Sequence, residues 1–402
     1  MAPLTLSGRE YAMPKHYLHG TQRARSPQDT WAAYARWMPL LGITRLANMT
    51  GLDRIGLPVY TAIRPNARSV VTTPGRGLDA VSAQVSALMA SIERWHGEYL
   101  VLPVRWASYL ALHHIAPVVD VATLLLRPDS DLSLDQLLPW IEGYALLQQQ
   151  ALWVPLDAVS VNAVASPTST LYMSSNGLAA GNDLLEAVVH GLCEVIERDA
   201  TALWSLHEPR QQLDLSTVDD PGCQQVLDLL AQADVCTAVW DITSDIGIPT
   251  YGCTIFDRPD HLPGRVVRPY NGFGCHLSPA IALLRALTEA VQNRVTSIAG
   301  CRDDWVRDTS TPPEDPERLQ ALWETLSAPK SPVAFAAQPS RAAESFEADI
   351  HTVLAALRRV GLTRAIVVDL SQPAIGIPVV KVLVPGLEGP LGGRPGPRAT
   401  HL

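Results

Sequence analysis

The chain has 402 residues, of which 47% are hydrophobic, and 31 basic against 40 acidic side chains give it a formal net charge of −9. This composition predicts a folded protein with a sizeable core, not a disordered chain. The acidic balance excludes a general surface for nucleic acid or anionic membranes. We find no signal-peptide pattern, no apolar run long enough to span a membrane, and six cysteines without a CxxC pair. We therefore expect a cytoplasmic protein with neither a nucleic-acid nor a membrane partner.

Three segments share one pattern, in which a strand-forming run, a polar turn, Ile-Gly-(Leu/Ile)-Pro and a second strand-forming run follow one another. They are residues 43–65, 238–257 and 365–385. Gly permits an unusual backbone angle in the turn, and Pro is tolerated at the first residue of the returning strand. Helix-period segments precede them, over residues 30–41, 223–233 and 346–360. The pattern predicts one α+β body, residues 1–402, built from repeated helix-strand-turn-strand units with mixed or antiparallel sheets flanked by helices.

Longer helical patterns cover residues 79–99, 183–200 and 279–299, and the one over 183–200 is mostly apolar. Four of its polar residues form a stripe within a sector of about 80° at 100° per residue; they are Glu186, His190, Glu194 and Glu197. The alternative interpretation is that the stripe is the solvated face of an amphipathic helix, but such a face is usually wider. Stacked carboxylates repel one another and need cations or water opposite them. Asn182 is the predicted N-cap of this helix.

The helix over 279–299 carries Arg285, Glu289 and Gln292 at i, i+4 and i+7, although such an Arg–Glu pair is also common on surfaces. The Gly-rich segment NGFGCH, residues 271–276, precedes it and could approach a ligand closely. The helix over 79–99 carries Ser86 and Glu93 and follows Arg76, which two glycines flank. No Walker A loop is present, but a basic residue just before a helix is a candidate phosphate contact.

Clustered carboxylates without Cys or His at ligand spacing favour a hard cation, above all Mg²⁺ bridging nucleotide phosphates. The residues alone therefore predict phosphoryl chemistry with ATP.

These motifs resemble those of the YcaO family, ATP-dependent enzymes that modify backbone amides of ribosomally made peptides. The matching segments, in order, are SALMASIERWHGE (86–98), SSNGLAAGNDLLEAVVHGLCEVIERDA (174–200) and RALTEAVQNRVTSIAGCRDD (285–304). The resemblance runs from about residue 15 to residue 388 and implies a YcaO-type fold around a nucleotide cleft. Within it we expect a surface linker region over 308–341, and after it a flexible Pro/Gly-rich tail over 389–402.

The resemblance also implies roles for individual residues. The Mg²⁺ ligands would be Glu93, Glu194 and Glu197. The nucleotide would contact Lys15, Thr21, Arg76, Ser86, Asn182, Glu186, Arg198, Arg285 and Glu289, of which Arg198, Arg285 and Glu289 would be catalytic. The chain departs from the family pattern at Ala90, where a Glu is expected four residues after the serine. One Mg²⁺ ligand is thereby lost, and Glu98 would replace it poorly because it points elsewhere on the helix.

In the family reaction a nucleophile adds to the amide carbonyl, the oxyanion takes the γ-phosphoryl group of ATP, and phosphate departs. A Cys, Ser or Thr side chain as nucleophile gives an azoline, external sulfide a thioamide, and a backbone amine an amidine. Residues 19–23 (HGTQR) and 44–66 resemble the stand-alone members found with TfuA proteins. We therefore expect thioamidation of a ribosomal precursor peptide, with a TfuA-like or leader-binding partner protein, by a homodimer. Azoline-forming cyclodehydration and amidine-forming macrocyclisation are the alternatives.

Two further hypotheses come from other classes of protein. His190 and Cys193 lie three residues apart on one predicted helix, so a Cys/His amidohydrolase is conceivable, although a helical Cys among Leu and Val is usually a core residue. A YcaO-like scaffold that binds but does not turn over its ligand is the second, and Ala90 is the argument for it.

Overall fold

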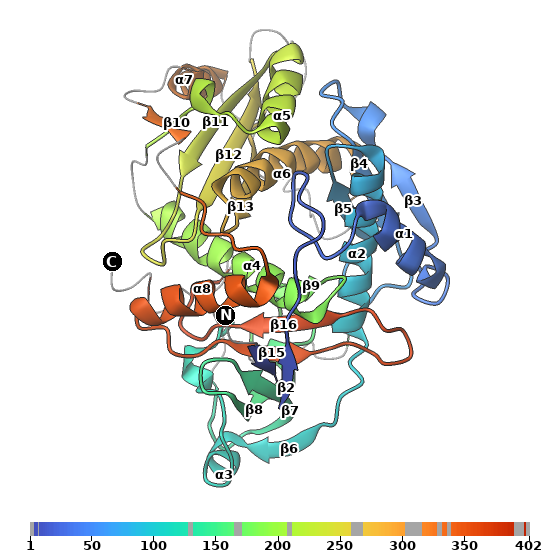
Figure 1. The fold of residues 1–402 in the computed structure, drawn as a ribbon, viewed down its shortest axis with the longest axis vertical. Helices are drawn as coiled ribbons and strands as arrows, with labels where there is room; N and C mark the ends of the chain where they lie inside the picture. Colours follow the sequence, from blue (N-terminus) through green and yellow to red (C-terminus); the bar gives the residue numbers. More distant parts are fainter. Residues whose placement is uncertain are drawn as a thin grey trace.

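A computed structural model describes residues 4–6, 8–127, 132–164, 171–206, 211–258, 268–301, 316–327, 332–335, 339–389 and 398. Three layers of sheet and helix are arranged around the middle of the molecule, where three long helices come together (Figure 1): α2 (Ala80–Glu98), α4 (Leu184–Leu206) and α6 (Pro279–Ala299). Across the described ranges, no helix combines the length and the apolar character that crossing a membrane requires.

Two of the layers are antiparallel three-stranded sheets in which the third strand leads directly into a long helix. The first contains β3 (Arg45–Asn48), β4 (Val59–Ile63) and β5 (Thr72–Arg76), followed by α2 (Ala80–Glu98). The second contains β11 (Val235–Asp241), β12 (Thr250–Asp257) and β13 (Tyr270–Cys275), followed by α6 (Pro279–Ala299). The strand-to-helix connections place the beginning of α2 and of α6 toward the middle of the molecule.

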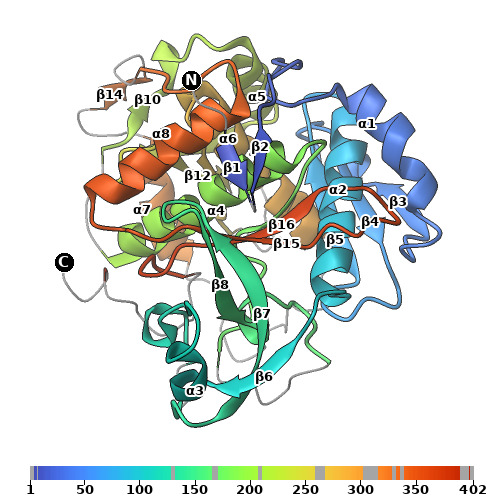
Figure 2. The ribbon, with the colours of Figure 1, turned by 60° about the horizontal axis from the view of Figure 1, so that its bottom comes forward.

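The third layer repeats this plan with strands from distant parts of the chain. The hairpin of β15 (Ile366–Asp369) and β16 (Val379–Leu383) is completed by β9 (Leu178–Ala180), which pairs antiparallel with β16 and precedes α4 (Leu184–Leu206). The same sheet continues through β7 (Leu137–Ala145), which pairs with β6 (Arg105–Ser108) and β8 (Gln150–Pro155). With α3 (Tyr109–His113), these strands extend away from the body as an arm (Figure 2).

The repeated Ile-Gly-(Leu/Ile)-Pro motif forms the expected antiparallel hairpins. Its glycines, Gly56, Gly247 and Gly376, have φ of 78°, 72° and 71°, the left-handed region that side chains disfavour. Each Pro lies immediately before the returning strand, one residue earlier than expected. The predicted helices precede the hairpins as α1 (Pro27–Tyr34), α5 (Pro221–Gln232) and α8 (Phe346–Arg359). The first is shorter than expected, since a 3-10 turn follows Tyr34.

The remaining elements are short or peripheral: β1 (Leu4–Leu6), β2 (Arg9–Tyr11), β10 (Leu213–Asp214), α7 (Pro316–Ser327) and β14 (Val333–Ala334). The helix α7 lies in the predicted linker region, and its Leu319 is buried against Phe256. Of that region, residues 308–315, 328–331 and 336–338 lie outside the described residues. So does the predicted tail, except for Gly389 and Arg398.

The glycines before the long helices serve helix packing. A Cβ at Gly272 on β13 would lie 2.2 Å from the backbone nitrogen of Ala290, and one at Gly75 on β5 would lie 2.0 Å from that of Ala87. These glycines therefore face the backbones of α6 and α2. The Gly-rich pattern of NGFGCH predicts a segment that approaches a ligand, whereas in the structure its Gly272 allows a close contact between a strand and a helix.

Replacing Gly272 by Ala is expected to lower the free energy of unfolding by about 2–3 kcal/mol, because the added methyl group must push α6 away from β13. Denaturant unfolding followed by circular dichroism measures the change. The matched control is Gly51→Ala, where a Cβ would meet no atom within 4 Å. Equal stability of the two variants would contradict the packing argument.

Candidate nucleotide and metal site

A cleft of about 1610 Å³, including the part open to solvent, lies where α2, α4 and α6 meet the N-terminal segment. Nearly all of the predicted site residues line it: Thr21, Arg76, Ser86, Glu93, Asn182, Glu186, Glu194, Glu197, Arg198, Arg285 and Glu289. Lys15 is not among the lining residues. Its buried Nζ lies 2.5 Å from Asp349 Oδ2 and donates to the carbonyl of Ala343 at 2.8 Å. The ammonium group of Lys15 is therefore already paired with a carboxylate of the protein.

The stripe on α4 faces this cleft and not bulk solvent. Glu186 is only 2% exposed, and its carboxylate accepts a hydrogen bond from the backbone nitrogen of Ala24 at 2.9 Å. Arg23, which also lines the cleft, approaches the same carboxylate at 3.4 Å. Glu197 is 7% exposed. A solvated amphipathic face is thereby excluded for these residues, and each needs the partner that it has.

The start of α4 differs from the sequence prediction by one residue. The helix begins at Leu184, and Asp183 Oδ1 accepts from the backbone nitrogen of Leu185 at 2.9 Å. The side chain of Asn182 therefore does not cap the helix. Its Oδ1 accepts from Thr30 Oγ1 at 3.0 Å, and its Nδ2 lies 3.5 Å from Glu186 Oε1. Asn182 therefore joins α1 to the polar stripe.

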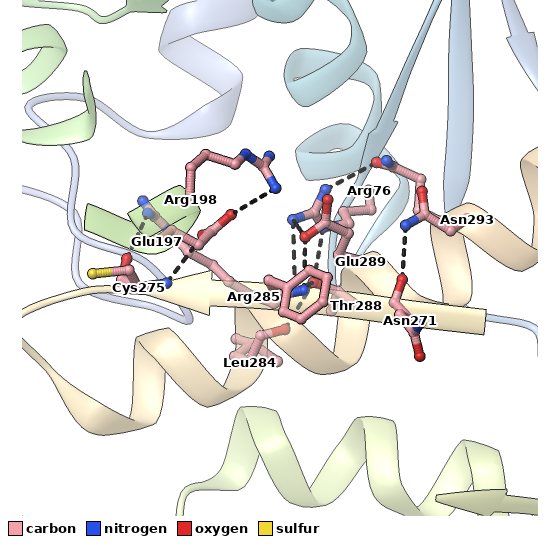
Figure 3. A network of polar contacts seen from close by, with 12 residues as sticks. Arg76, Glu197, Arg198, Asn271, Cys275, Leu284, Arg285, Thr288, Glu289 and Asn293 are labelled. Carbon is pink, nitrogen blue, oxygen red and sulfur yellow. Dashed lines mark hydrogen bonds and ion pairs between the residues drawn. The ribbon is translucent and has the colours of Figure 1, made fainter. Parts of the chain in front are cut away.

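The backbone of Cys275 holds the acidic and basic groups of two helices together (Figure 3). Its nitrogen donates to Glu197 Oε2 at 3.1 Å, and its carbonyl accepts from Arg285 Nη1 at 3.0 Å. The other oxygen of Glu197 lies 3.4 Å from Arg198 Nη1. The end of β13 thus fixes the position of a carboxylate on α4 relative to a guanidinium on α6.

Arg76 on β5 crosses to α6 and joins the same network (Figure 3). Its Nε donates to Thr288 Oγ1 at 3.1 Å and its Nη1 to Gln292 Oε1 at 3.1 Å. Its Nη2 lies 3.9 Å from Glu289 Oε2, which accepts from the backbone nitrogen of Phe273 at 2.9 Å. Arg76 is thus oriented before any ligand binds, as pre-organised anion recognition requires.

The carboxylates at the other end of the cleft lack full charge compensation. Burial and the nearby Glu194 raise the pKa of Glu93 to about 8. Burial chiefly raises the pKa of Glu194 to about 7, with Glu197 adding repulsion and Arg198 opposing the rise. Glu93 accepts from the backbone nitrogen of Ala180 at 3.1 Å, whereas Glu194 makes no hydrogen bond or ion pair with the described residues. Such groups gain most from a bound cation.

These donors fit Mg²⁺, which is bound through one or two carboxylates together with substrate phosphates and waters. Within the described ranges, no three His, Cys, Asp or Glu side chains are assembled closely enough to form a complete metal cage. Mg²⁺ in nucleotide sites does not require one. Ala90, the departure from the family pattern, lines the cleft one turn before Glu93. Glu98 is unavailable as a replacement, because Arg64 holds it by two hydrogen bonds of 2.6 and 2.7 Å.

The pKa of Glu93 gives a stability prediction for the metal-free protein. The ordinary pKa of an accessible Glu is 4.5 and the pKa of Glu93 in the folded protein is about 8, so the folded state binds more protons between these pH values. The free energy of unfolding should therefore fall as the pH rises from about 5 to 8. We expect a lower Tm at pH 8 than at pH 6, a smaller difference in Glu93→Gln, and a larger stabilisation by Mg²⁺ at pH 8. Scanning calorimetry tests this, and a Tm that rises over this range equally in both proteins would contradict it.

The structure also tests the hypothesis of a Cys/His pair on α4. His190 lines the cleft as a neutral imidazole, because burial and the guanidinium groups of Arg285, Arg23 and Arg76 lower its pKa well below the usual value. Cys193 is fully buried in the core and does not line the cleft, so His190 and Cys193 do not face a ligand together. Arg23 belongs to the HGTQR segment, but its contact with Glu186 could not be predicted from that segment alone.

Comparisons with known proteins identify the family of the chain. The family profile described as YcaO cyclodehydratase, ATP- and Mg²⁺-binding, matches residues 74–388. The chain belongs to the YcaO family. An uncharacterized protein of Methanothermobacter thermautotrophicus is 34% identical over 377 residues, which cover 91% of this chain and 95% of that protein. A Rhizobium leguminosarum bv. trifolii protein, described by its location in the tfuA 3' region, is 31% identical over 92% of this chain and 90% of its own.

Solved structures share the YcaO fold along almost the whole chain. YcaO from Methanopyrus kandleri, bound with AMPPCP and Mg²⁺, superposes with a TM-score of 0.74 at 23% identity, covering 94% of this chain and 95% of that one. A heterocyclase in complex with substrate and cofactor superposes with a TM-score of 0.79 at 23% identity and covers 96% of this chain. The present chain spans only 54% of that heterocyclase.

Proposed function

We propose that the protein uses ATP and Mg²⁺ to modify backbone amides of a ribosomally made peptide. The observation that carries the proposal is the convergence of carboxylates and guanidinium groups from three separate layers on one cleft. Family membership supports the same reaction class, and the Methanopyrus relative binds a nucleotide analogue and Mg²⁺. When bound, Mg²⁺-ATP would supply the phosphoryl group that turns an amide oxygen into a leaving group.

The residues of the chain divide this work between two ends of the cleft. Glu93, Glu194 and Glu197 would hold the metal, since their carboxylates are oxygen donors whose pKa values burial raises, and Glu93 and Glu194 lack full charge compensation. Arg76 and Arg285 would bind phosphate oxygens, because both guanidinium groups are fixed by backbone or side-chain acceptors and line the cleft.

The remaining predicted roles divide in the same way. Arg198 and Glu289 would complete the catalytic group. Asn182 and Glu186 lie nearer the N-terminal segment and would contact the nucleoside, with Thr21 and Ser86 beside it. A role for Lys15 would be indirect, through the segment that it anchors to Asp349.

Within the family reaction we propose thioamidation, with external sulfide as nucleophile and a TfuA-like partner. The support is the sequence pattern of residues 19–23 and 44–66, together with a relative whose description places it in a tfuA region. A homodimer, a precursor peptide as substrate and a cytoplasmic location belong to the same proposal. Azoline and amidine formation remain the competing products, because the nucleophile alone distinguishes them.

Mass spectrometry of a precursor peptide incubated with the protein, its partner, ATP, Mg²⁺ and sulfide tests the proposal. Exchange of one oxygen for one sulfur in the peptide is the result expected. Loss of one water would replace thioamidation by azoline or amidine formation. An unchanged peptide mass with every component present, while the nucleotide still binds, would contradict the enzymatic proposal.

Ala90 favours one alternative, a scaffold that binds nucleotide or peptide without turnover. Because Ala90 lines the cleft, a Glu at this position would add a carboxylate to the site itself. The scaffold hypothesis requires an inactive native protein and an active Ala90→Glu variant. Our proposal requires turnover by the native protein, and ADP release measured in both proteins decides between them.

A further inference from the structure

A buried lysine lies behind the carboxylates at the metal end of the cleft. Lys381 occupies the middle of β16 and is 1% exposed, and its Nζ donates a hydrogen bond to the carbonyl of Ser174. It faces a small cavity of about 560 Å³, including open solvent, that Asn176 and Val195 also line. Lys381 does not line the nucleotide cleft, and the proposed function gives it no role.

The charge of Lys381 acts on the proposed metal ligands. Lys381 pairs in register with Leu178 of β9, two residues before Ala180, whose backbone nitrogen donates to Glu93. From this position its ammonium group attracts Glu194 most strongly and Glu93 next. These carboxylates repel each other, and Arg94 is the further cation that acts on both. Burial lowers the pKa of Lys381 to about 8, so the group is charged at pH 7. A buried ammonium is costly unless opposite charges compensate it, and here that charge would come from Glu194 and Glu93 in their ionised forms, which are the forms that bind a metal.

Charge balance connects this lysine to Ala90. The position of Ala90 lines the cleft next to Glu93, and Ala supplies no charge there. Glu98 is committed to Arg64, so α2 contributes one carboxylate to the metal end. A site with fewer carboxylates attracts fewer divalent cations. An ammonium group near the carboxylates further reduces the number of divalent cations needed to balance their charge.

We propose that the ammonium group of Lys381 supplies positive charge to Glu93 and Glu194 that bound divalent cations would otherwise have to supply, so that the site operates with fewer metal ions than one with Glu at position 90. Lys381 is a positioning residue in this account, because it acts through the two carboxylates and does not touch the nucleotide. The inference rests on the proposed metal site but not on the identity of the peptide product.

Mn²⁺ binding to the full chain, followed by electron paramagnetic resonance at pH 7 without peptide or turnover, tests the inference. Lys381→Gln removes the charge but keeps a donor for the carbonyl of Ser174, Lys381→Met removes both, and Lys381→Arg keeps the charge. We expect Gln and Met to bind Mn²⁺ roughly threefold or more tightly than the native protein, because a repelling charge is lost, and Arg to match the native protein. In the double variant A90E/K381Q we expect one more Mn²⁺ per chain.

Each other outcome overturns the inference. A change in Lys381→Met alone would assign Lys381 a structural role through Ser174. Unchanged affinity and stoichiometry in all variants, with circular dichroism showing folded protein, would remove Lys381 from the metal site. Absence of Mn²⁺ binding in every protein, including the native one, would instead reject the proposed function on which the inference rests. The two failures are thereby distinguishable.

Discussion

Replacing Glu197 by Gln is expected to weaken Mg²⁺-dependent binding of AMPPCP by roughly 100-fold, as loss of a metal-site group commonly does. The Gln side chain has nearly the same shape and keeps an oxygen that can accept from the nitrogen of Cys275. The missing negative charge is therefore the main change at a position that is 7% exposed and faces the cleft. Isothermal titration calorimetry with and without Mg²⁺ measures the effect.

Asp199→Asn is the matched control on the same helix. Asp199 is fully buried, lies two residues after Glu197, and pairs with Arg398 at 3.0 Å outside the cleft. We expect nucleotide affinity within about twofold of the native protein once folding has been verified. A similar loss of affinity in both variants would show that the effect of Glu197→Gln comes from general disturbance of α4.

Replacing Arg285 by Met should raise the Kd for AMPPCP by about 10- to 100-fold, since a charged hydrogen bond contributes about 1.5–3 kcal/mol. The carbonyl of Cys275 holds this guanidinium in place at 3.0 Å, so little ordering cost remains when a phosphate binds. Arg285→Lys keeps the charge without the planar donor group, so its Kd for AMPPCP should lie between those of the native protein and Arg285→Met. Arg54→Met, which removes a cation paired with Asp257 outside the cleft, should leave Kd unchanged. Equal effects of Arg54→Met and Arg285→Met would contradict the assignment.

Local sequence patterns predicted much of the fold. The hairpins could be read from Ile-Gly-(Leu/Ile)-Pro because Gly and Pro restrict the backbone directly, and α6 has the predicted bounds because Pro279 and Gly300 delimit it. The placement of β9 could not be read in this way. Its partner β16 lies about 200 residues later, and only long-range packing decides that these strands pair.

In the candidate site, too, local sequence patterns predicted some features, whereas others depend on long-range packing. Residues on a helical stripe were predicted together because their spacing places them on one face, and the cleft contains them. Lys15 illustrates the limit, since only the folded chain shows that Asp349 takes its charge. Lys381 had a usable signal, a single Lys within the apolar run VVKVLV of a strand, because a buried strand rarely includes a charge without a partner.

The central claim is that acidic side chains from α2 and α4 bind the metal while arginines of β5 and α6 bind the phosphates. A crystal structure with AMPPCP and Mn²⁺, using the anomalous signal of Mn²⁺, tests it most directly. We predict a peak at the carboxylates of Glu93, Glu194 and Glu197, with phosphate oxygens beside Arg76 and Arg285. A nucleotide outside this cleft, or a peak remote from these carboxylates, would contradict it.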